Sequence, residues 1–294
     1  MVSLHVEPTS RCTLACPRCE RTTFIEKFGK NNFSINDLNI DDFINFLDIK
    51  VDEINFCGNL GDPIYHKDFL KLVSLSKTKS NKISITTNGS RKNKIWWNEL
   101  VSLLDKQDNV TFSIDGTPDN FTEYRINGDW ESIKTGIDIC TRSKVRTTWK
   151  YIPFSFNEDD IEDASNLSTS LGIDKFKLDP SDRWEVNDYL RPKNNYIGPR
   201  ALTQKKYKTS SVRDFVIDPK CSDDTMHYIG ADGLYAPCCY SKHYHFWYKS
   251  EWWKNKVRIK DNNLTECIKL FERFKSSIHD CKPDYCQFNC GISK

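Results

Sequence analysis

The feature that most constrains the fold is a regular alternation of strand-like and helix-like segments over the first 180 residues. Runs typical of β-strands occupy residues 3–7, 53–57, 82–87, 110–114, 146–153 and 175–178. Segments with apolar residues at helical spacing separate them, at 39–47, 68–75, 96–104, 130–140 and 161–171. Strands that alternate with helices form parallel sheets with right-handed crossovers. The pattern therefore predicts an α/β fold built on a parallel sheet.

Turn-forming residues stand where the second, third and fourth of these strands end. They are Gly58, then Asn88-Gly89, then Asp115-Gly116. Such pairs are ordinary turn formers, so each of them alone is a weak signal. The carboxyl ends of parallel strands, however, share one edge of the sheet, and ligands of α/β folds bind at that edge. We therefore expect the functional site there.

Twelve cysteines in 294 residues are the outlying feature of the composition, and they are grouped toward the two ends of the chain. No apolar run follows Met1, and none in the chain approaches the length of a membrane span. We therefore expect a cytoplasmic protein without a membrane partner. In a reducing compartment, clustered cysteines favour metal binding over disulfides. The formal net charge of +2 predicts no strong affinity for polyanions.

The first group of cysteines is the triplet Cys12, Cys16 and Cys19, spaced C-x3-C-x2-C directly after the first strand. Three thiolates can hold a cluster of four irons and leave one iron open to a further ligand. The alternative is a zinc site with a distant fourth ligand, although structural zinc sites more often use C-x2-C pairs. The spacing favours an open [4Fe–4S] cluster.

Three further segments follow the strands in order. They contain Gly61, Asp62 and Pro63 after the second strand, Thr87 and Asn88 at the end of the third, and Ser113 and Asp115 at the end of the fourth. Together with the triplet they resemble the radical S-adenosylmethionine (SAM) superfamily over roughly residues 3–180. The resemblance implies a partial (β/α)6 parallel barrel. It also implies that the Gly-Asp-Pro segment meets the amino group of SAM, while the other two segments line its ribose and carboxylate.

One position departs from that family's pattern. The residue before the third cysteine is usually aromatic in the superfamily, and here it is Arg18. The contact on the adenine side of SAM is therefore not implied by the resemblance.

The regular pattern ends near residue 180, and the rest of the chain divides in two. Residues 181–211 contain prolines, paired asparagines and lysines typical of a connector. Residues 212–294 carry seven of the twelve cysteines, which predicts a small unit supported by a cluster rather than by a large core. We therefore expect three parts, a barrel at 1–180, the connector, and a C-terminal unit.

The C-terminal cysteines begin with Cys221 and Cys238, which flank Gly233 in a C-x11-G-x4-C arrangement. This arrangement resembles the SPASM and twitch extensions of radical SAM enzymes and implies a twitch-like domain with one auxiliary [4Fe–4S] cluster. The competitors for four ligand positions are Cys221, Cys238, Cys281, Cys286 and Cys290, with Cys239 as a sixth candidate. We favour Cys221 and Cys238 with two of the last three. A structural zinc ion remains the alternative, because four thiolates suit zinc and iron–sulfur centres alike.

The resemblance implies the chemistry as well. The open cluster, reduced by a flavodoxin- or ferredoxin-like electron donor, would cleave SAM to a 5′-deoxyadenosyl radical that abstracts hydrogen from a substrate. The auxiliary cluster would bind substrate or accept an electron.

We expect a peptide or protein side chain as substrate, with a nucleotide or small molecule as the alternative. The sequence starts directly on the first strand, from which we expect no leader-binding domain ahead of it. A non-catalytic iron–sulfur or zinc-binding protein is the alternative of another class. The pattern does not predict the oligomeric state.

Overall fold

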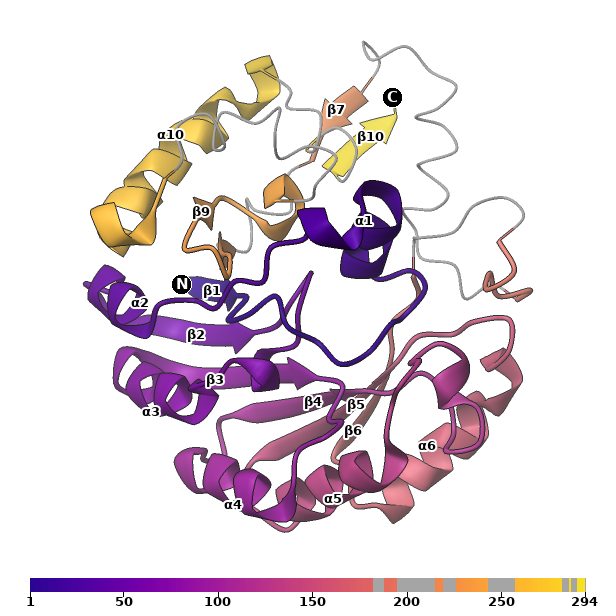
Figure 1. Ribbon diagram of the computed structural model, residues 1–294. Helices are drawn as coiled ribbons and strands as arrows, with labels where there is room; N and C mark the ends of the chain where they lie inside the picture. Colours follow the sequence, from indigo (N-terminus) through magenta and orange to yellow (C-terminus); the bar gives the residue numbers. More distant parts are fainter. Residues whose placement is uncertain are drawn as a thin grey trace.

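The structure is a computed structural model that describes residues 1–181, 188–194, 215–218, 226–242, 257–281, 286 and 290–293. Its centre is an eight-stranded sheet with the order β6-β5-β4-β3-β2-β1-β8-β9 (Figure 1). The first six strands in the chain are β1 (Ser3–Val6), β2 (Val51–Phe56), β3 (Ser80–Thr87), β4 (Asn109–Ser113), β5 (Arg146–Tyr151) and β6 (Lys175–Leu178). Each pairs in parallel with the next. The predicted parallel α/β fold is confirmed.

Helices connect these strands and cover the outer face of the curved sheet (Figure 1). They are α2 (Ile40–Phe46), α3 (Phe69–Lys79), α4 (Lys94–Leu103), α5 (Trp130–Thr141) and α6 (Ile161–Ser170). One helix was not predicted, α1 (Glu20–Phe28), which follows the cysteine triplet. It buries none of its residues, so it lacks the apolar spacing by which a helix is recognised in a sequence.

The outer face of the sheet is the apolar one. In β2 to β5, alternate residues are fully buried beneath the helices, as shown by Ile54, Phe56, Ile83, Ile85, Val110, Phe112 and Trp149. The helices pack closely over this face. A Cβ atom added to Gly136 on α5 would lie 2.6 Å from Cε2 of the buried Trp97 on α4. This layer supplies most of the hydrophobic core.

The inner face of the sheet is polar and only half-buried. Thr86, Thr111 and Thr148 stand in one row across β3, β4 and β5, and Asn55 and Ser84 stand in the next row. In a closed eight-stranded barrel the interior is packed with branched apolar side chains. Here the corresponding face offers hydroxyl and amide groups instead.

The remaining described strands come from the end of the chain. β8 (Met226–Ile229) pairs in parallel with β1, and β9 (Tyr235–Ala236) pairs antiparallel with β8. β7 (Phe215–Ile217) and β10 (Gly291–Ser293) form a separate antiparallel pair. Part of the segment assigned by sequence to a C-terminal unit thus extends the same sheet beyond β1. The division at residue 212 remains a prediction.

Helix α10 (Leu264–Cys281) packs against this part of the sheet. Its buried residues follow helical spacing: Leu264, Cys267, Phe271, Phe274 and Ile278. Short 3-10 turns occupy Lys30–Asn32, Pro63–Tyr65, Phe121–Glu123, Glu158–Asp160, Cys239–Lys242 and Ile259–Asp261. Within the described residues, no helix combines the length and the apolarity needed to cross a membrane.

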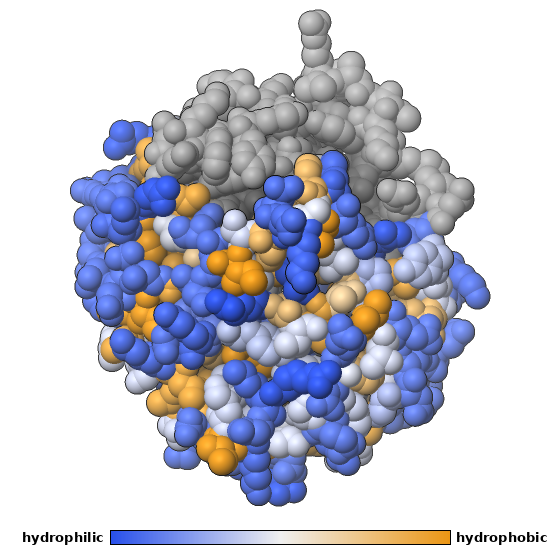
Figure 2. All heavy atoms as spheres, in the orientation of Figure 1, coloured by the Kyte–Doolittle hydropathy of each residue, from blue (hydrophilic) through white to orange (hydrophobic). Residues whose placement is uncertain are grey.

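Exposed large apolar side chains are scattered over the described surface, among them Phe28, Ile35, Ile95 and Tyr189. Figure 2 shows the same mixture on the face viewed there, where hydrophobic side chains are interspersed with hydrophilic ones. Single exposed apolar residues of this kind are normal for a protein surface.

Candidate active site

The three cysteines of the triplet lie on the loop between β1 and α1, at the carboxyl edge of the sheet. Cys16 is 6% exposed, while Cys12 and Cys19 are half-buried. All three contact a small apolar cluster of Leu14, Tyr124, Phe154 and Leu190. The loop therefore holds three sulfur ligands in an apolar setting, which is the donor set and environment that suit an iron–sulfur cluster.

Hydrogen bonds from side chains and from the backbone hold this loop in shape. Arg21 donates to the carbonyl oxygens of Cys12 and Leu14, and the amide of Ala15 donates to the carbonyl of Ile126 at 3.1 Å. The thiol sulfur of Cys12 accepts from the amide of Leu14 at 3.4 Å. Hydrogen bonds of this kind orient a ligand before the metal arrives.

Burial acts on the protonation of these thiols. It raises the pKa of Cys12 to about 12, and the negative charge of Asp62 adds to the effect. Burial also raises the pKa of Cys16, against which the guanidinium of Arg125 acts. Because thiolates rather than thiols bind metals, a cluster bound by these cysteines would release protons from the loop. Among the described residues, no three His, Cys, Asp or Glu side chains are arranged as ligands of a single metal ion.

The loop after β2 brings the predicted Gly61 and Asp62 against the cysteine loop. The amide of Asp62 donates to the carbonyl of Arg11 at 2.8 Å. A Cβ atom on Gly61 would lie 1.9 Å from the carbonyl oxygen of Thr9, so only glycine fits this close approach. Pro63 starts the buried 3-10 turn that follows.

Asp62 joins the ends of two strands. It is 6% exposed, and its carboxylate accepts from the Thr87 hydroxyl at 2.8 Å and from the backbone and side-chain amides of Asn88, both at 2.6 Å. Burial raises its pKa, and these donors oppose the shift. Asn88 also donates to the sulfur of Cys12 at 3.6 Å. Four of the sequence-predicted positions, Cys12, Asp62, Thr87 and Asn88, are therefore in one network.

Ser113 and Asp115 lie at the end of β4, and Ser113 is half-buried. Asp115 is fully buried, where its carboxylate accepts from the amide of Ile152 at 2.8 Å and lies 2.6 Å from Nε of Arg125. Burial raises the pKa of Asp115, and the charge of Arg125 opposes the shift.

Arg125 was missed by the sequence reasoning. It follows the 3-10 turn Phe121–Glu123, outside every strand and helix, and its charge affects the pKa of Cys16. A buried guanidinium beside the cysteine loop can receive a carboxylate. In the sequence Arg125 is only an arginine twelve residues after Ser113, and no helical or strand periodicity distinguishes it from other arginines.

Arg18, at the position where the superfamily has an aromatic residue, makes an ion pair instead. Its Nε lies 2.9 Å from the buried carboxylate of Asp188, and its guanidinium lies 5.9 Å from the ring centroid of Tyr189. The next residue, Leu190, belongs to the apolar cluster around the cysteines. Arg18 thus ties the segment after the barrel to the cysteine loop.

The C-terminal cysteines are described only in part. Cys221 lies outside the described residues, and of Cys281 only the backbone at the end of α10 is described. Cys238 and Cys239 follow β9, while Cys286 is buried and Cys290 accepts through its carbonyl from the amide of Asp218 at 2.8 Å. The choice of four auxiliary ligands stays a prediction.

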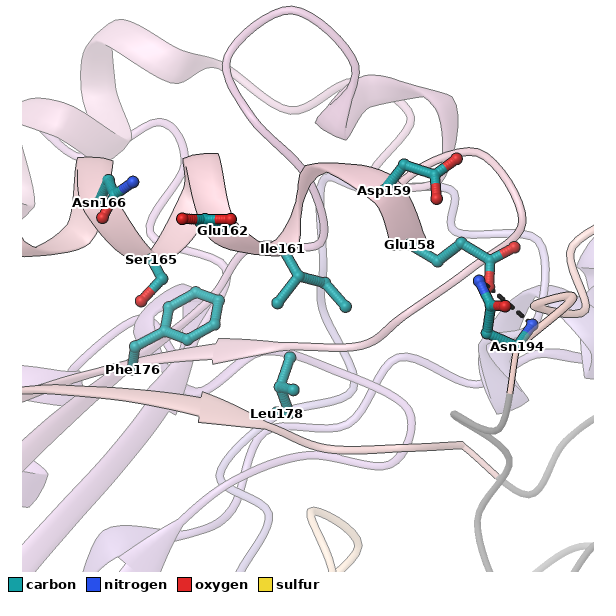
Figure 3. Close-up of a pocket in the computed structure, with 9 residues that line it drawn as sticks. All are labelled: Glu158, Asp159, Ile161, Glu162, Ser165, Asn166, Phe176, Leu178 and Asn194. Carbon is teal, nitrogen blue, oxygen red and sulfur yellow. Dashed lines mark hydrogen bonds between the residues drawn. The ribbon is translucent and has the colours of Figure 1, made fainter.

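A pocket of about 760 Å³ lies at the other end of the sheet, between α6 and β6 (Figure 3). Its apolar side is formed by Ile161, Phe176 and Leu178, and its acidic rim includes Glu158 and Glu162. The carboxylate of Glu158 accepts from the backbone and side chain of Asn194, both at 2.9 Å. None of the predicted site residues lines this pocket.

The chain is similar to known proteins in its sequence and in its fold. A family model described as the radical SAM superfamily matches residues 6–167. A cofactor-modifying protein for tungsten-containing aldehyde ferredoxin oxidoreductase, from Pyrococcus furiosus, is 30% identical over 118 residues, which are 40% of this chain and 32% of that protein. An S-adenosylmethionine-dependent nucleotide dehydratase from Selenomonas ruminantium is 35% identical over 94 residues, 30% of each chain. The matches thus span about a third of these relatives.

Among solved structures, native anSMEcpe with bound AdoMet and Kp18Cys peptide has a similar fold. The TM-score is 0.61 at 16% sequence identity, and the alignment covers 98% of this chain and 88% of that chain. At this identity the likeness shows the fold alone.

Proposed function

The chain belongs to the radical SAM superfamily, and from this premise we propose that Cys12, Cys16 and Cys19 hold an open [4Fe–4S] cluster for an enzyme that abstracts hydrogen from its substrate. The observation that carries the proposal is that the three cysteines lie on one loop against one apolar cluster, and that Cys12 contacts the Asp62–Asn88 network. A bound, reduced cluster supplies the electron for reductive cleavage of SAM to methionine and a 5′-deoxyadenosyl radical.

The side chains around the loop would bind and orient SAM. The Asp62 network holds the segment at Gly61 close to the cysteines, where its backbone can meet an ammonium group. Arg125 offers a guanidinium beside Cys16 to the carboxylate of SAM. Tyr124 and Phe154, whose ring centroids lie 4.2 Å apart, help to exclude water from the sulfurs.

The auxiliary [4Fe–4S] cluster is part of the same proposal. Its ligands would be Cys221 and Cys238 with two of Cys281, Cys286 and Cys290. Two observations support it. One is the C-x11-G-x4-C spacing of Cys221 and Cys238. The other is that β10, which directly follows Cys290, pairs with β7, so that distant segments of the C-terminal part lie side by side. The cluster would bind substrate or accept an electron from the product radical.

We expect the substrate to be a peptide or protein side chain. The polar inner face of the sheet supports a hydrogen-bonding substrate, because Thr86, Thr111 and Thr148 present hydroxyl groups below the carboxyl edge. The solved structure with a similar fold holds a peptide together with AdoMet.

A nucleotide is the second candidate. One of the curated relatives is a nucleotide dehydratase. The inner face also carries a cation, Lys150, which stands in register with Ser113; an anionic group of a nucleotide would compete for it with the carboxylate of Asp179, which lies 2.6 Å away.

The test begins with anaerobic reconstitution. We expect about eight irons per chain, the content of two [4Fe–4S] clusters, and formation of 5′-deoxyadenosine on reduction with SAM present. Mass spectrometry of peptides and of nucleotides incubated with the reduced enzyme and SAM then identifies the substrate class by a fixed mass shift. If the protein binds zinc instead of iron and cleaves no SAM, the enzymatic proposal is refuted and the protein is a zinc-binding protein.

A further inference from the structure

One buried carboxylate connects three segments that meet behind the cysteine loop. Glu7 follows β1 and is 2% exposed. Its Oε1 accepts from the amides of Leu60 at 2.5 Å and Gly61 at 3.0 Å, and its Oε2 accepts from the hydroxyl of Tyr228 on β8 at 2.6 Å. The backbone adds a further link, since the amide of Glu7 donates to the carbonyl of Ile229 at 2.9 Å.

We propose that Glu7 and Tyr228 are a positioning pair that holds the loop at residues 58–63 in its SAM-binding conformation, which makes the SAM site depend on β8. This inference rests on the proposed function, and it deepens that function by assigning a role to two residues that contact no predicted ligand. Neither of them is a catalytic residue, because both act through the loop.

The loop needs such support because it lies tightly against the first strand and its extension. Gly61 approaches the carbonyl oxygen of Thr9 so closely that no side chain fits there. The half-buried Leu60 and Gly61 donate their backbone amides to Glu7, and amides shielded from part of the solvent need such an acceptor. The next residue, Asp62, accepts hydrogen bonds from Thr87 and Asn88. Glu7 therefore holds the near side of the loop and Asp62 holds its far side.

The hydroxyl of Tyr228 favours the ionised state of Glu7, in which its carboxylate binds the 58–63 loop best. Burial raises the pKa of Glu7, while the Tyr228 hydroxyl and the two amides lower it. The other titratable groups near Glu7 are His5 on β1 and Cys57 after β2. Loss of the tyrosine hydroxyl removes a donor that favours the ionised carboxylate, so it raises the pKa of Glu7 further. As the pH falls, Glu7 is then protonated earlier. Since a protonated carboxyl group accepts the two amides less well than a carboxylate, the loop loosens.

The experiment compares Tyr228→Phe with Tyr235→Phe in the reconstituted full-length enzyme. Both tyrosines are fully buried, on the adjacent strands β8 and β9, and both hydroxyls are hydrogen-bonded. Tyr235 contacts His227 and the carbonyl of Cys267, and neither lies in the 58–63 loop.

For Tyr228→Phe we expect an increase in KM for SAM of about tenfold, the effect of losing one hydrogen bond to a charged group. The kcat for SAM cleavage and the iron content should stay near the parent values. The acid limb of kcat/KM should move to higher pH. Tyr235→Phe should change none of these quantities.

A second measurement does not depend on SAM cleavage. Hydrogen exchange of peptides that span residues 58–63 should be faster in Tyr228→Phe than in the parent, and unchanged in Tyr235→Phe. The inference is overturned if Tyr228→Phe leaves KM, the acid limb and the exchange unchanged, or if Tyr235→Phe changes them equally. If the parent holds its iron and cleaves no SAM, the proposed function fails, while faster exchange in Tyr228→Phe still reports the tether to the loop.

Discussion

The two groups of cysteines differ in how far apart in the chain their members lie. The N-terminal triplet falls within eight positions of one loop, between Cys12 and Cys19. The C-terminal candidates run from Cys221 to Cys290, and they come from separate segments around β9, the end of α10 and β10. A local loop brings its ligands together with little chain entropy lost, whereas a dispersed set depends on the packing of the elements between them.

The same difference appears in the surroundings of the sulfurs. The triplet is supported by groups close in sequence, such as Arg21, and by groups at strand ends, such as Asn88. Near the C-terminal group, the amphipathic helix α10 packs its apolar face into the hydrophobic core. Ligand spacing therefore predicts the first proposed site from the sequence alone, whereas the proposed ligands of the second can meet only through tertiary packing.

The largest effect should come from Cys16→Ala. Loss of one of three ligands should reduce SAM cleavage to background and lower the iron content from about eight to about four per chain. Iron analysis and quantification of 5′-deoxyadenosine check this result. Cys140→Ala is the matched control, because Cys140 is equally buried but lies on α5 outside both groups. A Cys16→Ala enzyme that still cleaves SAM would refute the ligand assignment.

The next test separates two adjacent cysteines of the C-terminal group. Cys238→Ala should lower the iron content by about four per chain and leave SAM cleavage intact, because the triplet keeps its own cluster. Cys239→Ala should keep all of the iron. Equal iron loss in the two variants, or none in Cys238→Ala, would contradict the favoured ligand set.

The Arg125→Lys variant tests whether a residue outside the cysteine loop contributes to SAM binding. Lysine keeps the charge but loses the planar fork that pairs with a carboxylate. We expect kcat/KM for SAM to fall about 10- to 100-fold, the loss of a charge-assisted contact. Arg142→Lys, at a largely exposed ion pair with Asp138, should behave as the parent. If both variants are equally active, Arg125 has no part in SAM binding.

The smallest effect on chemistry should come from Gly136→Ala, on α5 in the helical layer that covers the outer face of the sheet. The added methyl group would press on Trp97, which should destabilise the fold by about 1–3 kcal/mol. Thermal unfolding of the reconstituted enzyme measures this change, while iron content and SAM cleavage below the transition should be unaltered. Lys134→Ala on the exposed side of α5 is the control, and an equal Tm for both variants would argue against the close contact.

Sequence patterns predicted the first six strands and the helices that separate them, because their apolar spacing reports burial on one face. They did not predict α1, which buries nothing, or the pairing of β8 with β1, because strand pairing is decided by contacts between segments distant in the chain. Arg125 and Glu7 escaped notice for a related reason. Glu7 bonds to Tyr228 and Arg125 acts on Cys16, and because both partners are distant in the chain, no local spacing records either contact.

By itself the sequence determined the alternating α/β fold, the cysteine triplet at the carboxyl edge and the family to which both belong. These features depend on periodicity and spacing over a few residues, which backbone geometry converts directly into structure. Only the tertiary structure joined Asp62 to the ends of β3, placed Arg125 beside Cys16 and linked Tyr228 to Glu7 across 221 positions. The reason is that hydrogen bonds and charges act through space, so their partners exist only once the sheet has brought its strands together.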